Sequence, residues 1–264
     1  MIRVGVLGAM GRMGGAVCGA VLGDPELELV AAVDPAFAGE GIPGTGLVAA
    51  ASIEALAEAG AEVAVDFSVA AAALENAAWC AAHGVHDVIG TTGFGEVGLL
   101  QLEATFSERG TTGSGAPGRE ANCVVAPNFA IGAVLMMRFA ELAAPWFETV
   151  EVIEMHHDSK VDAPSGTALL TAKRVSAARR DPAAAGDQPC ARGEESAPGV
   201  RVHSVRLRGL VAHHEVLLGT TGQLLTLRHD SLDRNSFMPG VLLAVKAVAD
   251  RPGFTLGLEP LLGF

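Results

Sequence analysis

The sequence predicts an α/β protein with two parts: a Rossmann-like domain with a parallel sheet that binds a nucleotide, and a second α+β domain with a mixed sheet. The chain opens with the short apolar run Ile2–Leu7, a glycine-rich turn and a stretch with helical spacing of apolar residues. This order is typical of the first unit of a parallel sheet. Strand-like and helical segments continue to alternate through residues 61–94. By contrast, residues 201–229 contain three alternating segments separated by glycines, which favours an antiparallel or mixed sheet.

The glycine-rich turn is a candidate phosphate site. Gly8, Gly11 and Gly14 separate the first predicted strand from the first helix. Glycines let backbone N–H groups approach a pyrophosphate, and the dipole of the following helix favours its negative charge. The G-x-x-G-x-x-G spacing departs from the standard G-x-G-x-x-G, so a tight turn without a ligand is the alternative.

Asp34 ends the second predicted strand, LELVAAVD, twenty residues after Gly14. A carboxylate at this place can accept hydrogen bonds from both ribose hydroxyls of an adenosine. It also repels a 2′-phosphate, which favours NADH over NADPH. Arg12, within the glycine turn, could still contact a 2′-phosphate, so the use of both cofactors stays open.

Two more strands are predicted within 61–68 and 85–94, with an alanine-rich helix over 69–82 between them. Each strand ends in a polar turn at its carboxyl end, which is the edge at which parallel sheets bind ligands. Because Asp87 interrupts the apolar run of the second of these strands, we expect that strand to begin at Val88.

The change of domain is predicted after residue 127, where a strand meets a Pro-Asn turn and an amphipathic helix begins. We expect the tail LGLEPLLGF to return to the first domain. Residues 1–127 and 236–264 would then form the nucleotide domain, and residues 128–235 the second domain. Two stretches rich in glycine and turn-forming residues, 107–122 and 179–199, are predicted as loops.

The stretch EMHHDSKVDAPSGTAL, residues 154–169, is the candidate active site. The chain has only three lysines, and one of them, Lys160, lies here. The sequence Pro-Ser-Gly-Thr that starts at Pro164 precedes a segment of good helix propensity. Free backbone N–H groups and two hydroxyls can therefore face an anion. With Lys160 they suit a carboxylate of a small substrate, whereas Asp162 is expected to cap this turn rather than take part in catalysis.

His156 and His157 follow each other at the end of a predicted strand, so their side chains point to opposite faces and at most one faces a given reacting atom. An imidazole suits general acid catalysis because its pKa lies near the working pH. No H-x-x-x-H or C-x-x-C spacing supplies further ligands, so a bound metal is not expected. The second pair, His213 and His214, lies in a strand without an anion-binding turn and is predicted at the strand surface.

The composition excludes several functions. A net charge of −12 argues against nucleic acid or an anionic membrane as a partner, and no apolar run approaches the ~20 residues of a membrane span. Scattered cysteines and the lack of a cleavable signal predict reduced thiols in a cytoplasmic protein. The chain has no tyrosine, which excludes a Tyr-x-x-x-Lys dehydrogenase, and it has neither a G-x-S-x-G elbow nor a P-loop.

These motifs resemble those of the dihydrodipicolinate reductase family of bacterial and plant lysine biosynthesis, also called 4-hydroxy-tetrahydrodipicolinate reductases. The similarity runs in order along essentially the whole chain, through VGVLGAMGRMG, VDFS, GTTGF, APNFAIGA, EMHHDSKVDAPSGTA, RHDSLDRNSFMPG and LGLEP. It implies a reductase that uses NADH or NADPH on a cyclic dicarboxylate imine, and a homotetramer formed through the sheet of the second domain. The family's usual VDFT, followed soon by proline, is here VDFS followed by alanines, a departure that could alter nucleotide affinity.

The resemblance also implies a role for each site residue. His156 would be the proton donor, Lys160 a second donor and carboxylate contact, and Arg234 would lie near the same pocket. The family's substrate-binding residues correspond to His157, Ser165, Gly166 and Thr167. Its cofactor-binding residues correspond to Gly8, Ala9, Met10, Gly11, Arg12 and Met13 at the pyrophosphate, Asp34 at the adenine ribose, and Gly90, Thr91, Thr92, Ala126, Pro127, Asn128 and Phe129 beside the nicotinamide.

Three other functions stay as alternatives: another two-domain amino-acid or sugar dehydrogenase, a nucleotide-sensing regulator without turnover, and a metal-dependent hydrolase. Those dehydrogenases commonly use a Glu-Lys-Pro or an isolated Lys/Asp arrangement, whereas Lys160 is followed here by Val161 and Asp162. A regulator would be expected to lack His156 or Lys160, and both are present. A metal-dependent hydrolase that used the histidine pairs would be inhibited by chelators and would not bind a nucleotide.

Overall fold

The computed structural model describes residues 1–107, 120–181 and 193–264. These residues form two compact units: Met1–Phe129 together with Phe237–Phe264, and Ala130–Ser236. The two predicted loops, 107–122 and 179–199, lie largely outside the described residues. The prediction for the end of the second loop was wrong, because Glu194–Ala197 forms a strand that pairs with the following strand. No helix in the described part of the chain is long and apolar enough to cross a membrane.

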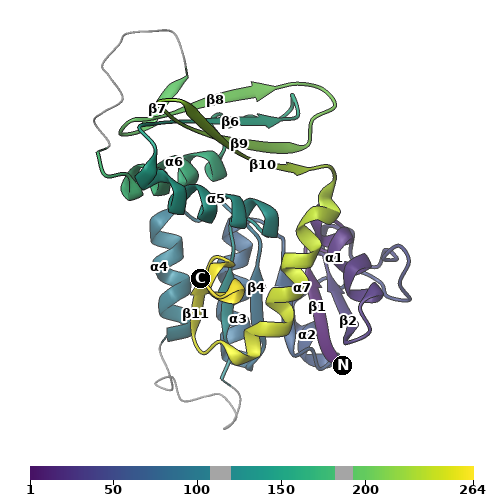
Figure 1. Ribbon diagram of the computed structural model, residues 1–264. Coiled ribbons are helices and arrows are strands. Elements are labelled where there is room, and N and C mark those ends of the chain that lie inside the picture. The colour runs from purple at the N-terminus through teal and green to yellow at the C-terminus, as the bar shows by residue number, and fades with distance from the viewer. Residues whose placement is uncertain (108–119, 182–192) are drawn as a thin grey trace. The chain divides into compact units, whose positions relative to one another are not determined.

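The first unit contains a parallel sheet flanked by helices (Figure 1). Its strands are β1 Ile2–Leu7, β2 Leu27–Val33, β3 Val63–Asp66, β4 His86–Ile89, β5 Cys123–Val125 and β11 Phe254–Leu256. Its helices are α1 Arg12–Gly23, α2 Glu54–Glu58, α3 Ala70–His83, α4 Gly95–Ser107, α7 Met238–Ala247 and α8 Glu259–Leu262, with the 3-10 turns η1 Pro35–Phe37 and η5 Val248–Asp250. All strand pairs are parallel, in the order β11-β5-β4-β3-β1-β2. The predicted Rossmann-like sheet is confirmed.

The strand order places ligand-binding turns at one edge of this sheet. β1 has β2 on one side and β3 on the other, so the direction of winding changes there, and open parallel sheets bind ligands beyond the carboxyl ends of the strands at such a point. The glycine turn, Asp34 and the segments that begin at Gly90 and Ala126 all follow strands directly. They therefore lie along the same edge.

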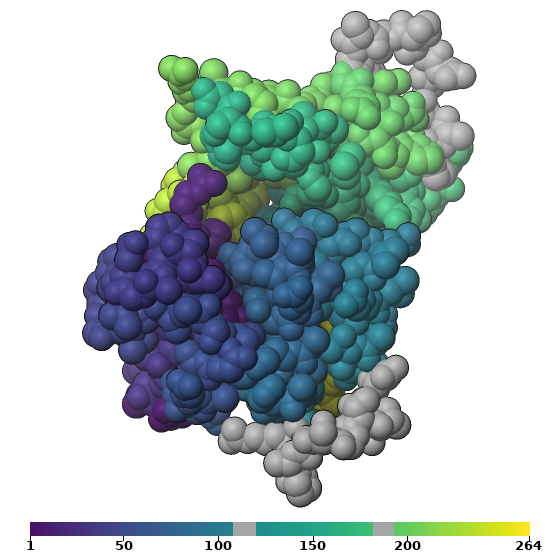
Figure 2. All heavy atoms as spheres, turned by 180° about the vertical axis from the view of Figure 1, so that it is seen from behind, coloured from purple at the N-terminus to yellow at the C-terminus, as the bar shows by residue number. Residues whose placement is uncertain are grey.

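The core of the first unit is made of small and β-branched side chains. All four residues of β3 and the last four of β1 are buried, and strands buried on both faces appear in sequence as continuous apolar runs. Leu56 of α2 and Cys80 of α3 pack against Leu7, while Leu102 of α4 packs against Ile89. The helices α3 and α4 form the blue surface of this unit seen from behind in Figure 2.

β4 begins at His86, two residues earlier than predicted. Asp87 is a member of the strand, and its Cα is in register with residues of both neighbouring strands. Its carboxyl group has no exposed surface, and neither oxygen has a hydrogen-bond partner among the described residues. Burial, with a smaller contribution from Asp66, raises the pKa of Asp87 well above its usual value. A raised pKa favours the neutral form of the carboxyl group, which lowers the cost of its place inside the strand.

The second unit contains a mixed sheet with helices on one face (Figure 1). Its strands are β6 Thr149–His156, β7 Glu194–Ala197, β8 Val200–Arg206, β9 Ala212–Thr220 and β10 Gln223–Ser231. Its helices are α5 Ile131–Ala143 and α6 Gly166–Ala178, with the 3-10 turns η2 Ala144–Trp146 and η4 Arg234–Phe237, the last of which runs into the first unit. The order is β10-β9-β6-β8-β7, in which β6 and β8 are parallel and the other pairs antiparallel. The predicted mixed sheet is confirmed.

The two faces of this second sheet differ. α5 packs against β9 and β10, and α6 against β6, β7 and β8. The side chains on that face include the buried Val152 and Leu218. Alternation along the strands puts other apolar residues on the opposite face, where Leu224 is 68% and Val205 38% exposed. We call this second face the open face of the sheet; it also carries Ile153, Met155 and Leu217.

Candidate active site

The glycine turn is fixed to the carboxyl end of β2. The backbone N–H groups of Gly8 and Ala9 both donate to the carbonyl oxygen of Val33, at 2.9 and 3.2 Å. Gly8 has a φ of +73°, and a Cβ on Gly14 would lie 2.0 Å from the Gly8 carbonyl oxygen. Glycine is required at both positions. The turn leads into α1, whose first N–H groups have no acceptor within the helix and are available to an anion.

Asp34 faces the same turn. Its Oδ2 atom accepts a hydrogen bond from the backbone N–H of Met10 at 3.0 Å, so the carboxylate is held beside the glycines. Arg12, the first residue of α1, is exposed. The acid and the arginine that bear on cofactor choice therefore both lie beside the glycine turn. The preference between NADH and NADPH stays a prediction.

A buried carboxylate fixes the next two turns. Asp66 ends β3 with no exposed surface. It accepts hydrogen bonds from the backbone N–H and the hydroxyl of Ser68 at 2.8 and 2.6 Å, from Asn76 Nδ2 at 2.7 Å and from Thr91 Oγ1 at 3.1 Å. One side chain thus joins the turn after β3 to the predicted nicotinamide segment after β4. No role for Asp66 was predicted from the sequence.

The two predicted nicotinamide segments border one cavity. Thr91 and Thr92 follow β4, Pro127 follows β5, and all three line a cavity of about 150 Å³. Its remaining walls are mostly carbon and come from Gly93, Phe94, Gly95, Leu99, Val125 and Leu256. Such a cavity with a few polar groups at its rim is suited to one face of an uncharged or delocalised ring.

Aromatic side chains pack beside these segments. The rings of Phe67 and Phe129 lie 5.9 Å apart and are tilted by 54°. Gly90 faces Phe67 so closely that a Cβ would lie 2.1 Å from the ring. Ala126 is buried, and its N–H donates to the Ile89 carbonyl oxygen at 3.0 Å. The predicted cofactor residues therefore lie on one edge of the first unit.

The histidine-lysine motif lies in the second unit, where β6 leads through a loop into α6. Lys160 Nζ lies 2.7 Å from Asp162 Oδ1, and this hydrogen bond lowers the pKa of the Asp162 carboxyl. Our prediction that Asp162 caps the turn was wrong. Ser165 directly precedes the helix, and its hydroxyl accepts a hydrogen bond from the Ala168 N–H at 3.3 Å. Asp162 lies too early in the chain for this role and pairs with the lysine instead.

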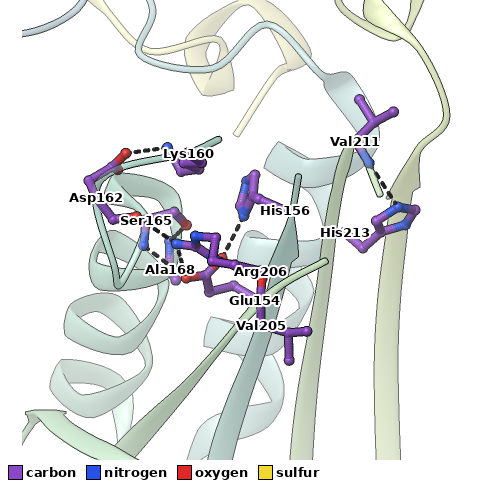
Figure 3. A network of polar contacts seen from close by, with 10 residues as sticks. All are labelled: Glu154, His156, Lys160, Asp162, Ser165, Ala168, Val205, Arg206, Val211 and His213. Carbon is purple, nitrogen blue, oxygen red and sulfur yellow. Dashed lines mark hydrogen bonds and ion pairs between the residues drawn. The ribbon is translucent and has the colours of Figure 1, made fainter. Parts of the chain in front are cut away.

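The two adjacent histidines have different surroundings. The side chain of His156 is 16% exposed, and its Nδ1 lies 2.5 Å from Oε2 of the buried Glu154 (Figure 3). Burial lowers the pKa of His156, and the contact with Glu154 opposes this. His157 Nδ1 lies 2.8 Å from the hydroxyl of Ser159 in the loop. Arg234, which the resemblance places near the pocket, is an exposed residue of η4.

His214 does not lie at the strand surface as predicted. It is 5% exposed because it shares the helix-covered face of β9 with Val216, and burial lowers its pKa to about 4. The side chain of His213, 11% exposed, pairs with Asp230 at 2.6 Å. Within the described ranges, no group of three or more His, Cys, Asp or Glu side chains is arranged to hold a metal ion.

Comparison with known proteins identifies the family. The model for the N-terminal part of dihydrodipicolinate reductase matches residues 2–129, and the model for its C-terminal part matches residues 132–262. The chain belongs to the dihydrodipicolinate reductase family. Similar members of this family are the 4-hydroxy-tetrahydrodipicolinate reductases of Nocardia farcinica, 48% identical over 99% of this chain and 98% of the relative, and of Cutibacterium acnes, 48% identical over 100% and 99%.

Solved structures agree with this assignment. The dipicolinate-bound dihydrodipicolinate reductase from Paenisporosarcina sp. TG-14 is similar with a TM-score of 0.82 and 39% identity, over 98% of this chain and 99% of that one. An amine dehydrogenase from Mycobacterium smegmatis has a TM-score of 0.63 over 98% and 95%, but only 16% identity. The likeness to that dehydrogenase shows the fold alone.

Two further side chains lie beside His156 and were given no role from the sequence: Glu154 and Arg206. Glu154 lies two residues before His156, so strand alternation puts both on one face, and this signal was present in the sequence. Arg206 lies 52 residues beyond Glu154 on another strand. No local pattern predicts that contact.

Proposed function

We propose that this chain reduces 4-hydroxy-tetrahydrodipicolinate to tetrahydrodipicolinate, with His156 as the proton donor and Lys160 as second donor and carboxylate contact. The reaction follows from the family: relatives that match over the full length are 4-hydroxy-tetrahydrodipicolinate reductases. The chain is an oxidoreductase of the diaminopimelate route to lysine and uses NADH or NADPH. The roles of single residues are our inference from the geometry.

The observation that carries these roles is the arrangement of the motif around the start of α6. Lys160 and the N-terminus of α6 belong to one short loop, and a carboxylate is stabilised by an ammonium group and by free helix N–H groups. A Cβ on Gly166 would meet no atom within 4 Å, so this helix start has room for a ligand. We assign carboxylate binding to Lys160, His157, Ser165, Gly166 and Thr167.

The first unit would hold the nicotinamide nucleotide. The residues from Gly8 to Met13 fit the pyrophosphate, Asp34 fits the adenine ribose, and the cavity beside Thr91 and Pro127 fits the nicotinamide. We therefore propose 1–127 with 236–264 as the nucleotide domain, and 128–235 as the domain that binds substrate and forms the tetramer. When bound, the nicotinamide supplies the hydride that adds to ring carbon four.

The residues of this chain would move the proton. Ring carbon four loses its hydroxyl and the neighbouring carbon loses a proton, which together leave as water. After hydride addition at carbon four, the Nε2–H of His156 returns a proton to the neighbouring carbon. An imidazolium suits this step because the ordinary pKa of a histidine lies near neutrality. Lys160 would hold the substrate carboxylate and balance its charge throughout.

The open face of the second sheet would form the subunit interface of a homotetramer. It carries apolar side chains that the single chain leaves partly exposed, such as Val205 and Leu224, and such faces are commonly buried by association. Light scattering after size exclusion should give the mass of four chains, and the mass of one chain would contradict this assignment.

We place the enzyme in the cytoplasm, which the free thiols of Cys18, Cys80 and Cys123 fit.

The reductase activity is tested by the loss of nicotinamide absorbance. NADH and then NADPH are mixed with the purified protein while the pathway's synthase generates the unstable substrate in the cuvette. Rapid oxidation that requires both the synthase and this chain supports the proposal, and the two kcat/KM values give the cofactor preference. Nucleotide binding without oxidation would contradict the reductase and favour the sensing alternative.

A further inference from the structure

Glu154 is a carboxylate in the interior of the second unit. Its side chain has no exposed surface, and a charge in such a place is costly unless it is paired. Arg206 donates to both carboxylate oxygens, from Nη1 at 2.9 Å and from Nη2 at 2.8 Å. The backbone N–H of Ser165 donates to Oε1 at 3.2 Å, and His156 Nδ1 lies 2.5 Å from Oε2. Figure 3 shows these groups converging on Glu154.

The charge state of Glu154 decides where the proton of His156 lies. Burial opposes ionisation of Glu154, but hydrogen bonds from Arg206, Ser204 and His156 outweigh it and lower its pKa to about 2. An ionised carboxylate only accepts hydrogen bonds, so Nδ1 of His156 carries the proton between the two side chains. Nε2 is then the nitrogen of His156 that can give a proton to a substrate.

Arg206 extends this contact to the loop. β6 and β8 are parallel neighbours in which His156 is in register with Arg206. Besides binding Glu154, Arg206 Nη2 donates to the carbonyl oxygen of Asp162 at 2.6 Å, and the side chain of Asp162 pairs with Lys160. A continuous set of contacts therefore joins the imidazole, the helix start and the lysine loop.

We propose that Glu154 and Arg206 are positioning residues for the reduction: they hold His156 in the tautomer protonated at Nδ1 and fix it relative to Ser165 and Lys160. The inference rests on the proposed function, because it takes His156 as the proton donor. An ion pair that only stabilised the sheet would need the contact between Arg206 and Glu154. It would not need the contacts to His156 and to the Asp162 carbonyl.

Charged groups from several elements face His156. Burial lowers its pKa most, Glu154 on β6 opposes this, and Lys160 in the loop and Arg206 on β8 lower it further. His214 on β9 lies close enough to interact as well. Glu154 supplies the negative charge in this set. Its removal should therefore make His156 lose its proton at a lower pH.

The test variant is Glu154→Gln, which keeps the shape of the side chain and removes its charge. Its amide can donate to Nδ1 and so favours the opposite tautomer. We expect kcat to fall by roughly 10- to 100-fold, with little change in KM for the nucleotide. The limb of the pH profile on which activity falls with rising pH should move to lower pH. A wild-type pH profile in an active E154Q would overturn the inference.

Glu195→Gln is the matched control. Glu195 is also a strand carboxylate, and it accepts a backbone N–H from Gly199 at 3.0 Å and faces Arg201 at 3.9 Å. These partners include no imidazole. The variant should keep the wild-type kcat and pH profile, and this shows that loss of a strand carboxylate alone does not move them.

A double variant separates positioning from general destabilisation. If Glu154 acts through His156, E154Q should lower kcat little further in a His156→Gln background, because the two effects share one group. If the two substitutions instead lower kcat by factors that multiply in the double variant, the inference is overturned, while the reductase activity of the wild-type chain is unaffected. Failure of the proposed function is seen separately, because the wild-type chain itself would then oxidise neither nucleotide.

Should E154Q not fold, the wild-type chain still tests the proposal. Heteronuclear NMR of the imidazole nitrogens reports which one carries the proton, and H156Q identifies the signal of His156. We expect a protonated Nδ1 in the neutral ring. A proton on Nε2 instead would overturn the proposal.

Discussion

The hydroxyl of Thr91 donates a hydrogen bond to the carboxylate of Asp66, with 3.1 Å between Oγ1 and Oδ1. Asp66 ends β3 and Thr91 follows β4, so the contact ties the carboxyl ends of two neighbouring strands together. Asn76 of α3 binds the other oxygen of the same carboxylate. The turn that we assign to the nicotinamide is thus held in place by a buried carboxyl group.

Loss of the Asn76 amide should loosen this turn. A hydrogen bond to a charged group contributes about 1.5–3 kcal/mol, so Asn76→Ala should lower the free energy of unfolding by about that amount and raise KM for the nucleotide. Urea unfolding and steady-state kinetics measure both. Glu75→Ala, at the exposed neighbouring position of α3, should change neither. The same free energy of unfolding and the same KM for the nucleotide in both variants would contradict a role for the Asp66 contacts.

The adjacent residues Gly14 and Gly15 should respond differently to substitution by alanine. A Cβ on Gly14 would lie 2.0 Å from the Gly8 carbonyl oxygen, whereas the nearest atom to a Cβ on Gly15 is 3.9 Å away. Gly14→Ala should therefore displace the turn and abolish nucleotide binding in calorimetry. Gly15→Ala should bind as the wild type does, and it should be stabilised by up to about 1 kcal/mol through its helix propensity. Tight binding by G14A would refute our placement of the pyrophosphate.

Lys160 should matter chiefly for substrate binding. A charge-assisted contact with a carboxylate contributes about 1.5–3 kcal/mol, or roughly 10- to 100-fold in affinity. We expect Lys160→Ala to raise KM for the substrate by that factor, with a lower kcat if the lysine also donates a proton. Lys173→Ala, on an exposed position of α6, controls for the loss of a positive charge. An unchanged KM in K160A would remove the carboxylate contact from the mechanism.

His214 should make the fold sensitive to mild acid. Its pKa is about 4 in the folded chain against an ordinary 6.5, so the unfolded chain takes up the proton first as the pH falls below 6.5. Because of this residue, the free energy of unfolding should fall by about 2 kcal/mol between pH 6.5 and pH 4.5. Glu154, with a lowered pKa of about 2, adds its own loss only below about pH 4.5. Urea unfolding across the upper window should show a smaller drop for His214→Gln, and an unchanged drop would exclude His214 as its source.

Local patterns in the sequence sufficed for much of the fold and the nucleotide site. β1 and the glycine turn are adjacent in the chain. The apolar run reflects the burial of the strand, and the glycines reflect the close approach of backbone atoms in the turn. The start of β4 was missed because burial, which raises the pKa of Asp87, arises only from the folded structure. Asp162 was misassigned because its pairing with Lys160 competes with capping. The contact between Arg206 and Glu154 depends on the register of β6 and β8, which no spacing in the sequence reveals.

Isotope transfer can show whether this chain catalyses hydride transfer from the nicotinamide to ring carbon four of the substrate. NADH deuterated on the transferable position is supplied while the synthase generates the substrate, and the product is analysed by NMR. We predict one deuterium on ring carbon four and a proton from solvent on the neighbouring carbon, with loss of product in H156Q. Product that forms without deuterium at carbon four, or the absence of product with the wild-type chain, would contradict hydride transfer to this carbon by this enzyme.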